Sequence, residues 1–283
     1  MTLTPEQFER VAALEAHQQR LARLERMSYH ELQVVLTGDP AEAALWVRSA
    51  AEYGVPAAQL RLGRMLLEGN GVERNEGAAF NWFVRAADRG DAEAMNMAGR
   101  CYENGWGVAT DPAKAAERYR SSAEAGHDWG EYNFGNLLFD GRGVPQDQRQ
   151  ALQWYLRAAQ RGHGRAMNLA ARCFEEGWGC TKSPGEAAEW YRRSAEAGYF
   201  RAQFNYAVLL AELGEGPGAA EWFKKALASG DTGVHRATLQ VLAGATDPVL
   251  VELRERLQPR DPRTGPPRAS SLPNAIDNHS YSQ

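Results

Sequence analysis

A short phrase of small residues that ends in glycine recurs along this chain at a constant interval. Four successive steps between its copies are 36 residues long, and the last is 32 residues; the glycines are Gly54, Gly90, Gly126, Gly162, Gly198 and Gly230. An unbroken alanine column keeps the same spacing: Ala43, Ala79, Ala115, Ala151, Ala187 and Ala219. Self-similarity at such a period is the signature of a stacked-repeat architecture. We therefore expect one small structural unit, used repeatedly.

Each unit has the pattern of two helices joined by a turn. In the copy at residues 93–126, "EAMNMAGRCYENG" is predicted to be helical and to end at Gly105, where glycine suits a left-handed C-cap. The second helix is expected to begin after Asp111, with Pro112 at its first position. Good N-cap residues form a column at the corresponding places of the repeats: Asn75, Asp111, Asp147 and Ser183.

The same start signal, Asp39-Pro40, marks the beginning of the array, which we place at residues 39–230. Residues 1–38 are expected to form capping helices, the first being an amphipathic helix from about Thr4 to Arg26. Its apolar stripe is Phe8, Val11, Leu14, Leu21 and Leu24. Further capping helices are predicted within 231–257. The segment 258–283 is rich in Pro, Ser and Asn, and we expect it to be disordered.

Helices this short cannot bury both of their faces within one pair, so the pairs must stack against one another. Small residues in the first helices let neighbours approach closely: Gly63, Gly99, Gly135, Ala171 and Ala207. The predicted fold is all-α, an α-solenoid of helix pairs.

These residues resemble a known family. The pattern A-x-x-x-L-G-x-x-L-x-x-G-x-G-V, followed by D-P-x-K-A and W-Y-x-x-A-A-x-x-G, is similar to the Sel1-like repeat, a relative of the tetratricopeptide repeat; it is clearest in residues 57–90 and 151–162. The resemblance implies a right-handed superhelix. It also implies an adaptor or scaffold that has no chemistry of its own, although hydrolase activity has been proposed for some relatives.

Composition narrows the classes of partner. A net charge of −4 gives no reason to expect nucleic acid. No apolar run approaches the ~18 residues that a membrane span requires, and the N-terminus is polar, so neither membrane insertion nor a secretory signal is expected. With only three cysteines, a cytoplasmic protein is the simplest interpretation.

Neither the cysteines nor the histidines predict a chemical site. Cys101, Cys173 and Cys180 occupy columns where sister repeats carry apolar residues, so we expect core thiols, and no disulfide between the last two. His127 and His163 are expected to be solvated turn residues, since neither has a second ligand at metal-binding spacing. Catalytic motifs are absent from the sequence, and we expect no enzyme activity, metal or cofactor.

The concave face of such an array is where we expect a partner to bind. By analogy with tetratricopeptide arrays it would be lined by the first helices, with asparagine bridging a peptide backbone, arginine binding a carboxylate and aromatic rings forming a floor. The predicted binding residues are Arg64, Asn96, Arg100, Trp129, Tyr132, Asn136, Phe139, Asn168, Arg172 and Phe204. The ligand would be an extended peptide or segment of a protein partner.

Two alternatives remain open from the sequence. The near-copies "CYENGWG" and "CFEEGWG" indicate a duplicated two-repeat block, so the Asn–Arg alternation also fits a face without a specific ligand. Trp106 and Trp178, in the turns, could either anchor a partner along the edge or pack on their own helix ends. A structural or regulatory subunit docking by its convex face, edge or tail is the rival function. The sequence leaves the oligomeric state undecided.

Overall fold

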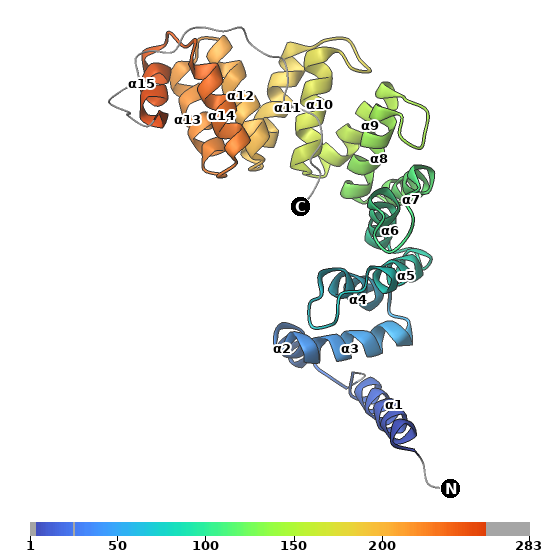
Figure 1. Ribbon diagram of the computed structural model, residues 1–283. Coiled ribbons are helices and arrows are strands. Elements are labelled where there is room, and N and C mark those ends of the chain that lie inside the picture. The colour runs from blue at the N-terminus through green and yellow to red at the C-terminus, as the bar shows by residue number, and fades with distance from the viewer. Residues whose placement is uncertain (1–3, 25, 259–283) are drawn as a thin grey trace. The chain divides into compact units, whose positions relative to one another are not determined.

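The computed structural model describes residues 4–24 and 26–258, and all regular structure within them is helical (Figure 1). The helices are α1 (Pro5–Leu24), α2 (Tyr29–Thr37), α3 (Pro40–Tyr53), α4 (Pro56–Glu68), α5 (Glu76–Ala87), α6 (Ala92–Asn104), α7 (Pro112–Glu124), α8 (Asp128–Asp140), α9 (Gln148–Gln160), α10 (Gly164–Glu176), α11 (Pro184–Glu196), α12 (Phe200–Glu212), α13 (Gly216–Leu227), α14 (Thr232–Leu242) and α15 (Pro248–Leu257). Apart from Gln258, the segment predicted to be disordered lies outside the described residues.

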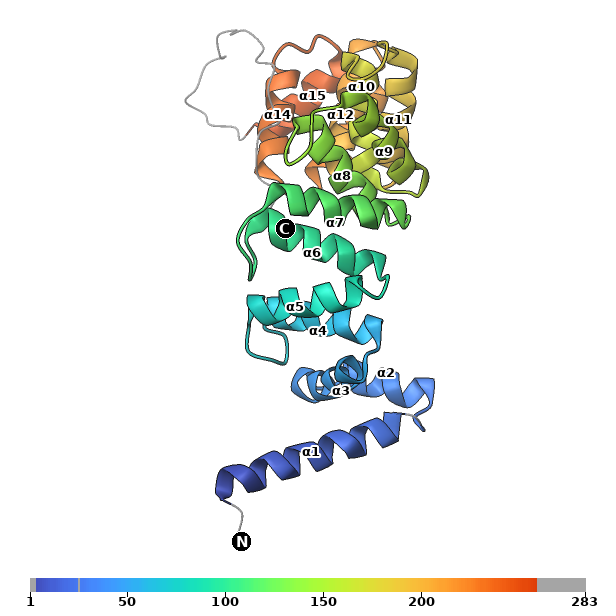
Figure 2. The ribbon, with the colours of Figure 1, turned by 90° about the vertical axis from the view of Figure 1, so that its right-hand side faces the viewer.

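The chain divides into two compact units, Met1–Ala187 and Ala188–Gln283. The division falls inside α11 and is not among the boundaries that the sequence suggested. Within the first unit, each helix from α3 to α9 packs against the helix before it and the helix after it, so that the pairs stack in chain order (Figures 1 and 2). The predicted all-α solenoid of helix pairs is confirmed.

Side-chain caps start the second helices α5, α7 and α9, as the sequence predicted. The carboxylate of Asp111 accepts a hydrogen bond from the backbone N–H of Lys114 at 3.0 Å, and Asn75 and Asp147 cap α5 and α9 in the same way. The first helix α6 ends at Gly105, which has the left-handed φ of 77° expected of a glycine C-cap.

A second glycine in each turn brings neighbouring repeats into backbone contact. Gly107 has φ 68°, and a Cβ atom on it would lie 2.2 Å from the carbonyl oxygen of Glu76, the first residue of the preceding second helix. The other turns of this unit repeat the approach; the glycine and the residue it meets are Gly71 and Pro40, Gly143 and Pro112, and Gly179 and Gln148. Only glycine fits such a place.

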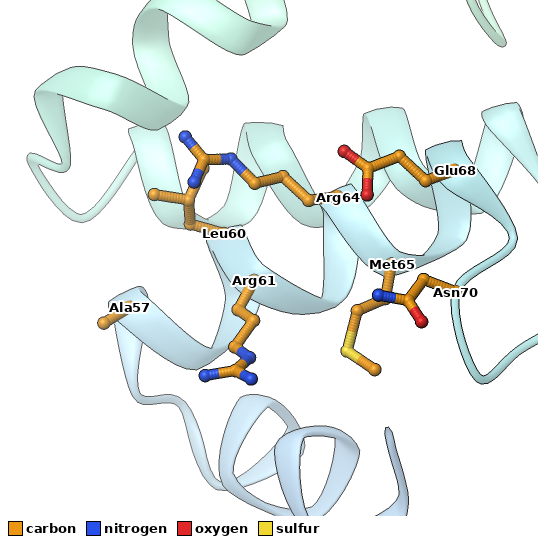
Figure 3. A pocket seen from close by; sticks show the side chains of 7 residues that line it. All are labelled: Ala57, Leu60, Arg61, Arg64, Met65, Glu68 and Asn70. Carbon is orange, nitrogen blue, oxygen red and sulfur yellow. The ribbon is translucent and has the colours of Figure 1, made fainter. Parts of the chain in front are cut away.

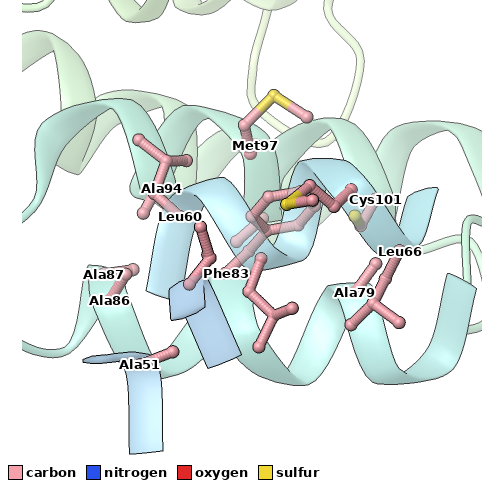
Figure 4. Close-up of a cluster of buried hydrophobic side chains, with 14 of the residues drawn as sticks. Ala51, Leu60, Leu66, Ala79, Phe83, Ala86, Ala87, Ala94, Met97 and Cys101 are labelled. Carbon is pink, nitrogen blue, oxygen red and sulfur yellow. The ribbon is translucent and has the colours of Figure 1, made fainter. Parts of the chain in front are cut away.

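Inside each pair, an aromatic ring of the second helix lies on a small residue of the first. A Cβ added to Gly63 would lie 2.5 Å from the Phe83 ring, and one added to Gly99 would lie 2.7 Å from the Tyr119 ring. Phe83, Tyr119 and Cys101 are fully buried, and Figure 4 shows Phe83 and Cys101 within the core around α4, α5 and α6. The small-residue column therefore seats the rings, as well as letting helices approach.

One charged side chain lies inside the array, and it was not predicted from the sequence. Glu131 on α8 is fully buried, and its two carboxylate oxygens face Arg157 at 3.2 Å and Arg161 at 3.4 Å on α9. Burial raises the pKa of the Glu131 carboxyl group, while the two guanidinium groups oppose that shift. At the corresponding place in α4, Gln59 donates to the carbonyl oxygen of Ala51 instead.

The N-terminal helices differ in packing from the prediction. The side chain of His17 on α1 lies 3.1 Å from the Ser49 hydroxyl on α3, and Arg23 lies over the Trp46 ring. Leu14, which was expected on the buried stripe, is 59% exposed, and Val11 is also exposed. Polar and cationic side chains in the C-terminal half of α1 thus contact α3.

The second unit has its own core around α12, α13 and α15. Phe223 and Leu242 are fully buried there, and Leu250 and Leu253 of α15 complete the cluster. The start of α15 is capped by Asp247, whose carboxylate accepts from the backbone N–H of Val249 at 2.9 Å. These last two helices lie where the sequence predicted them.

We predict that Gly107→Ala destabilises the protein more than Gly90→Ala. Both glycines have positive φ, so both substitutions carry the cost of a left-handed alanine, about 1–2 kcal/mol. A Cβ at Gly90 meets nothing within 4 Å, whereas at Gly107 it meets backbone. The clash should add a further ~1–3 kcal/mol, measured as the difference in free energy of unfolding in urea. Equal losses for the two variants would contradict the close approach.

Candidate binding surface

The first helices of the first unit are joined side by side through their side chains. Arg64 on α4 forms an ion pair with Glu93 on α6. The side-chain amide of Asn133 on α8 donates to Asn96 Oδ1 on α6 at 2.8 Å. The helices α4, α6, α8 and α10 thus form one continuous side of this unit, which we call the first-helix face.

Three of the predicted binding residues are buried beneath this face. Asn96 is 5% exposed and its oxygen is taken by Asn133, and Asn168 and Tyr132 are buried as well. The expectation that these asparagines bridge a ligand's backbone is therefore revised: Asn96 holds α6 to α8. The predicted residues that reach the surface of this unit are Arg64, Arg100, Trp129, Asn136, Phe139 and Arg172.

Trp129 is the large aromatic side chain that the first-helix face exposes most, at 41%. Its ring meets the ring of Tyr132 edge-on at 5.9 Å and that of His163 at 4.5 Å. The guanidinium of Arg165, from α10, lies 5.3 Å from its centroid. The indole is thus fixed by neighbours on two helices, and part of its surface is left open.

His163 is not a solvated turn residue, contrary to the sequence expectation. It is 6% exposed, caps α10 by accepting from the backbone N–H of Ala166 at Nδ1 (3.1 Å), and stacks on Tyr132 at 4.8 Å. His127 caps α8 in the same manner. Asp91, at the equivalent position of the preceding repeat, caps α6 with its side chain. An N-cap residue in this column was the sequence signal that His127 and His163 cap their helices.

Two arginines of the first-helix face lie on tryptophan rings. Arg100 lies 5.0 Å from the centroid of Trp106, and Arg172 lies 5.0 Å from that of Trp178. The pairs occupy equivalent places two repeats apart. Stacking on an indole holds a guanidinium in place. All four residues were predicted from the sequence as candidates, but their pairing was not.

Trp106 and Trp178 are half-buried and pack within the array. The ring of Trp178 meets Phe139, of the preceding first helix, at 5.1 Å. One repeat earlier, the positions equivalent to Trp178 and Phe139 hold Arg142 and Glu103, which form an ion pair at 2.9 Å. The sequence offered two roles for these tryptophans, anchoring a partner or packing on their own helix ends. The structure adds a third, because the indole of Trp178 joins its repeat to the preceding one.

The remaining predicted residues have defined surroundings. Asn136 Oδ1 accepts a hydrogen bond from the hydroxyl of Tyr155 at 2.9 Å, which fixes the orientation of the amide. Phe204 belongs to the second unit, where its ring meets Phe223 at 5.9 Å.

A pocket of about 400 Å³ lies along α4, lined by Ala57, Leu60, Arg61, Arg64, Met65, Glu68 and Asn70 (Figure 3). The guanidinium groups of Arg61 and Arg64 point to opposite sides of the helix, so they do not form a common clamp. Arg61 also donates to the carbonyl oxygen of Leu36 at 2.9 Å. Asn70 stands where the later repeats carry Trp106 and Trp178.

All three cysteines are free thiols and form no disulfide. Cys101 and Cys173 are buried, as expected, and burial raises the pKa of each to about 12. Cys180 is half-buried and its thiol donates to the carbonyl oxygen of Cys173 at 3.4 Å. In residues 4–24 and 26–258, His, Cys, Asp and Glu side chains form no cluster of three or more that could hold a metal ion.

A family model described as the Sel1 repeat matches residues 56–91, 92–127, 130–163, 164–199 and 201–231, more than half of the chain. The chain belongs to the Sel1 repeat family. The matched segments run from the first residue of α4 to residue 231, between the end of α13 and the start of α14. Proteins of this family generally mediate interactions between proteins, and their fold is typically a non-catalytic scaffold.

Solved structures show the same fold. This Sel1 repeat protein is similar to c5321, a protective antigen of uropathogenic Escherichia coli strains, with 26% identity and a TM-score of 0.69 over 89% of this chain and 55% of that one. It thus spans little more than half of c5321. It is also similar to a Sel1 repeat protein from Oxalobacter formigenes, with 27% identity and a TM-score of 0.70 over 80% of this chain and 94% of that one. No curated protein matches the chain. Among the described residues, none of the helices combines the length and apolar character needed to span a bilayer.

We predict that His163 makes the protein less stable in acid. Burial lowers the pKa of its imidazole from 6.5 to about 4, although Asp128 opposes this shift. The folded state thus favours the neutral ring, so stability is complete above pH 6.5 and declines as the pH falls toward 4. The difference between the two pKa values corresponds to roughly 3 kcal/mol.

The measurement is urea unfolding of the wild type and of His163→Asn at pH 7 and at pH 4.5. Asparagine keeps the N-cap acceptor but cannot titrate in this range, so the variant should lose less stability on acidification. His127→Asn is the matched control, because burial lowers the pKa of His127 too, but its side chain is less buried. The prediction fails if His163→Asn and wild type lose equal stability.

Proposed function

We propose that this Sel1 repeat protein is a non-catalytic adaptor that binds an extended segment of a partner protein along the first-helix face. A reducing cytoplasm is the compartment we propose, which suits the thiols of Cys173 and Cys180. The family's general role in protein interaction supports the class of function. The choice of face rests on the side chains that this face presents.

The observation that carries the proposal is the exposed indole of Trp129. Tryptophan and arginine are the side chains most enriched at binding hot spots, and such anchors are most effective when they are rigid before the partner arrives. Trp129 is fixed by the rings of Tyr132 and His163 and by Arg165. Arg100 and Arg172, stacked on their own indoles, flank it along the same face.

Docking through the second helices is the alternative, and one observation favours it. Arg85 lies 4.7 Å from the Trp82 ring on α5, and Arg157 lies 4.3 Å from the Trp154 ring on α9. These pairs repeat the cation-on-indole arrangement on second helices. Arg157 also pairs with the buried Glu131, however, so its position already has a structural reason.

The two functions are separated by selecting binders from a library of random displayed peptides and titrating the best as labelled synthetic peptides. We expect Trp129→Ala to weaken binding by at least about 30-fold, the loss typical of an anchor worth ~2 kcal/mol. Fluorescence anisotropy gives the dissociation constants, and circular dichroism verifies that the variant is folded.

Tyr53→Ala is the matched control, because Tyr53 is a 70% exposed aromatic on the second helix α3. Binding should survive that change. Failure to select any peptide, or peptides that bind Trp129→Ala as tightly as wild type, would rule out the first-helix face as the binding site.

A further inference from the structure

The pocket along α4 lies next to two positions at which sister helices carry an indole. One position is the second residue of a first helix, and the other is in the turn that follows it. Each later first helix of this unit has a tryptophan at one of the two: Trp129 in α8, and Trp106 and Trp178 in the turns after α6 and α10. At α4 the two positions hold Ala57 and Asn70, and both line the pocket (Figure 3). The pocket therefore adjoins both places from which an indole is missing.

The floor of the pocket is apolar. Leu60 is 8% exposed and Met65 is 6% exposed, and both line the pocket. Its volume of about 400 Å³ lies in the range of sites that hold small ligands. In α8, Trp129 at the Ala57 position meets Tyr132, at the Leu60 position, edge-on at 5.9 Å. A ring placed over Ala57 would contact Leu60 in the same way.

A cation already lies beside this place. In α8 the guanidinium on the Trp129 ring belongs to Arg165, from the next first helix. The position equivalent to Arg165 holds Glu93 in α6, and its carboxylate forms an ion pair with Arg64 of α4. The Arg64 side chain runs toward the Leu60 end of the pocket in Figure 3. Helix α4 thus has the cation of this arrangement without the ring.

The ion pair with Glu93 leaves the face of the Arg64 guanidinium open to a ring. A carboxylate binds the N–H donors, which lie in the plane of the group, whereas a ring stacks on its face. Both contacts occur together elsewhere in this chain, because Arg157 pairs with Glu131 at 3.2 Å and lies 4.3 Å from the centroid of Trp154. Among the described residues, no aromatic ring lies over Arg64.

We propose that the α4 pocket binds an aromatic side chain of the partner segment, with its ring over Ala57 and Leu60 and its face on the guanidinium of Arg64. This rests on the proposed function and specifies part of its ligand. An aliphatic side chain would use the apolar floor but not the cation. An acidic side chain would have to compete with Glu93 for the N–H donors of Arg64. Tryptophan attracts a cation more strongly than the other aromatic residues, and it is therefore the ring that we expect.

The test uses two displayed peptide libraries that share about twelve randomised positions. An extended segment of that length covers about 40 Å, and α4 and α8 are two helix spacings apart, about 20 Å, so one peptide can reach both the pocket and Trp129. One library has tryptophan fixed near one end, and the other has leucine there. We expect the tryptophan library to be enriched more. Replacing that tryptophan with leucine in a selected peptide should raise the dissociation constant on the order of ten-fold, a ratio that we call the tryptophan preference.

Variants of the protein then locate the tryptophan. Arg64→Met removes the cation and keeps a long side chain, so the tryptophan preference should fall to about two- to four-fold. Ala57→Trp places the protein's own ring where Trp129 lies in α8, and it should abolish the preference. Circular dichroism verifies that each variant is folded, and Arg64→Met alone decides the question if Ala57→Trp does not fold.

Arg120→Met is the matched control. Arg120 is an exposed arginine of the second helix α7 and pairs with Glu124 at 2.8 Å. Its replacement changes the net charge by the same amount as Arg64→Met and leaves the pocket intact. The tryptophan preference should stay on the order of ten-fold.

The outcomes separate this inference from the function on which it rests. Equal enrichment of the two libraries, with binding still lost in Trp129→Ala, would keep the binding face and overturn the aromatic pocket. A tryptophan preference that Arg64→Met leaves unchanged, or that Arg120→Met lowers equally, would also overturn it. Enrichment of neither library would remove both proposals.

Discussion

The array depends on backbone contact between repeats at one point of each turn. Gly107 lies so close to the carbonyl oxygen of Glu76 that no side chain fits, and three other turns of the first unit repeat the contact at the same 36-residue spacing. A solenoid has no single core, so its geometry accumulates from the relation of each pair to the next. A contact between backbones fixes the position of each helix pair relative to the next, whatever side chains the pairs carry. The first helices are therefore regularly spaced along the first-helix face.

Most of the fold could be predicted because it is encoded locally. An N-cap such as Asp111 and a C-cap such as Gly105 act within one turn of a helix, and a fixed period shows how often the unit recurs. The division inside α11 and the exposure of Leu14 could not be predicted in that way. Both depend on which helices meet, and a hydrophobic stripe shows only that burial would be favourable.

The binding surface was predictable in composition more than in arrangement. The sequence identified Trp129, Arg100 and Arg172, but it also assigned Asn96 to the surface, where the structure uses its oxygen to join two helices. Amides and arginines serve structure and binding equally well, so residue type does not separate the two roles. Comparison of columns across the chain's own repeats would have helped, because Glu103 opposite Arg142 and Phe139 opposite Trp178 are complementary pairs at the same two positions.

Those junctions also bear on how such an array can change in length. Leu67 and Trp106 occupy the positions equivalent to Phe139 and Trp178. If one repeat between them were deleted, Leu67 would face the guanidinium of Arg142. If two repeats were deleted, Leu67 would face the indole of Trp178, which is the same kind of side chain as Trp106. Recombination in blocks of two therefore preserves matching surfaces, and recombination by one does not. The chemistry of these junctions therefore recurs after two repeats, 72 residues, whereas the backbone contact at each turn recurs after one.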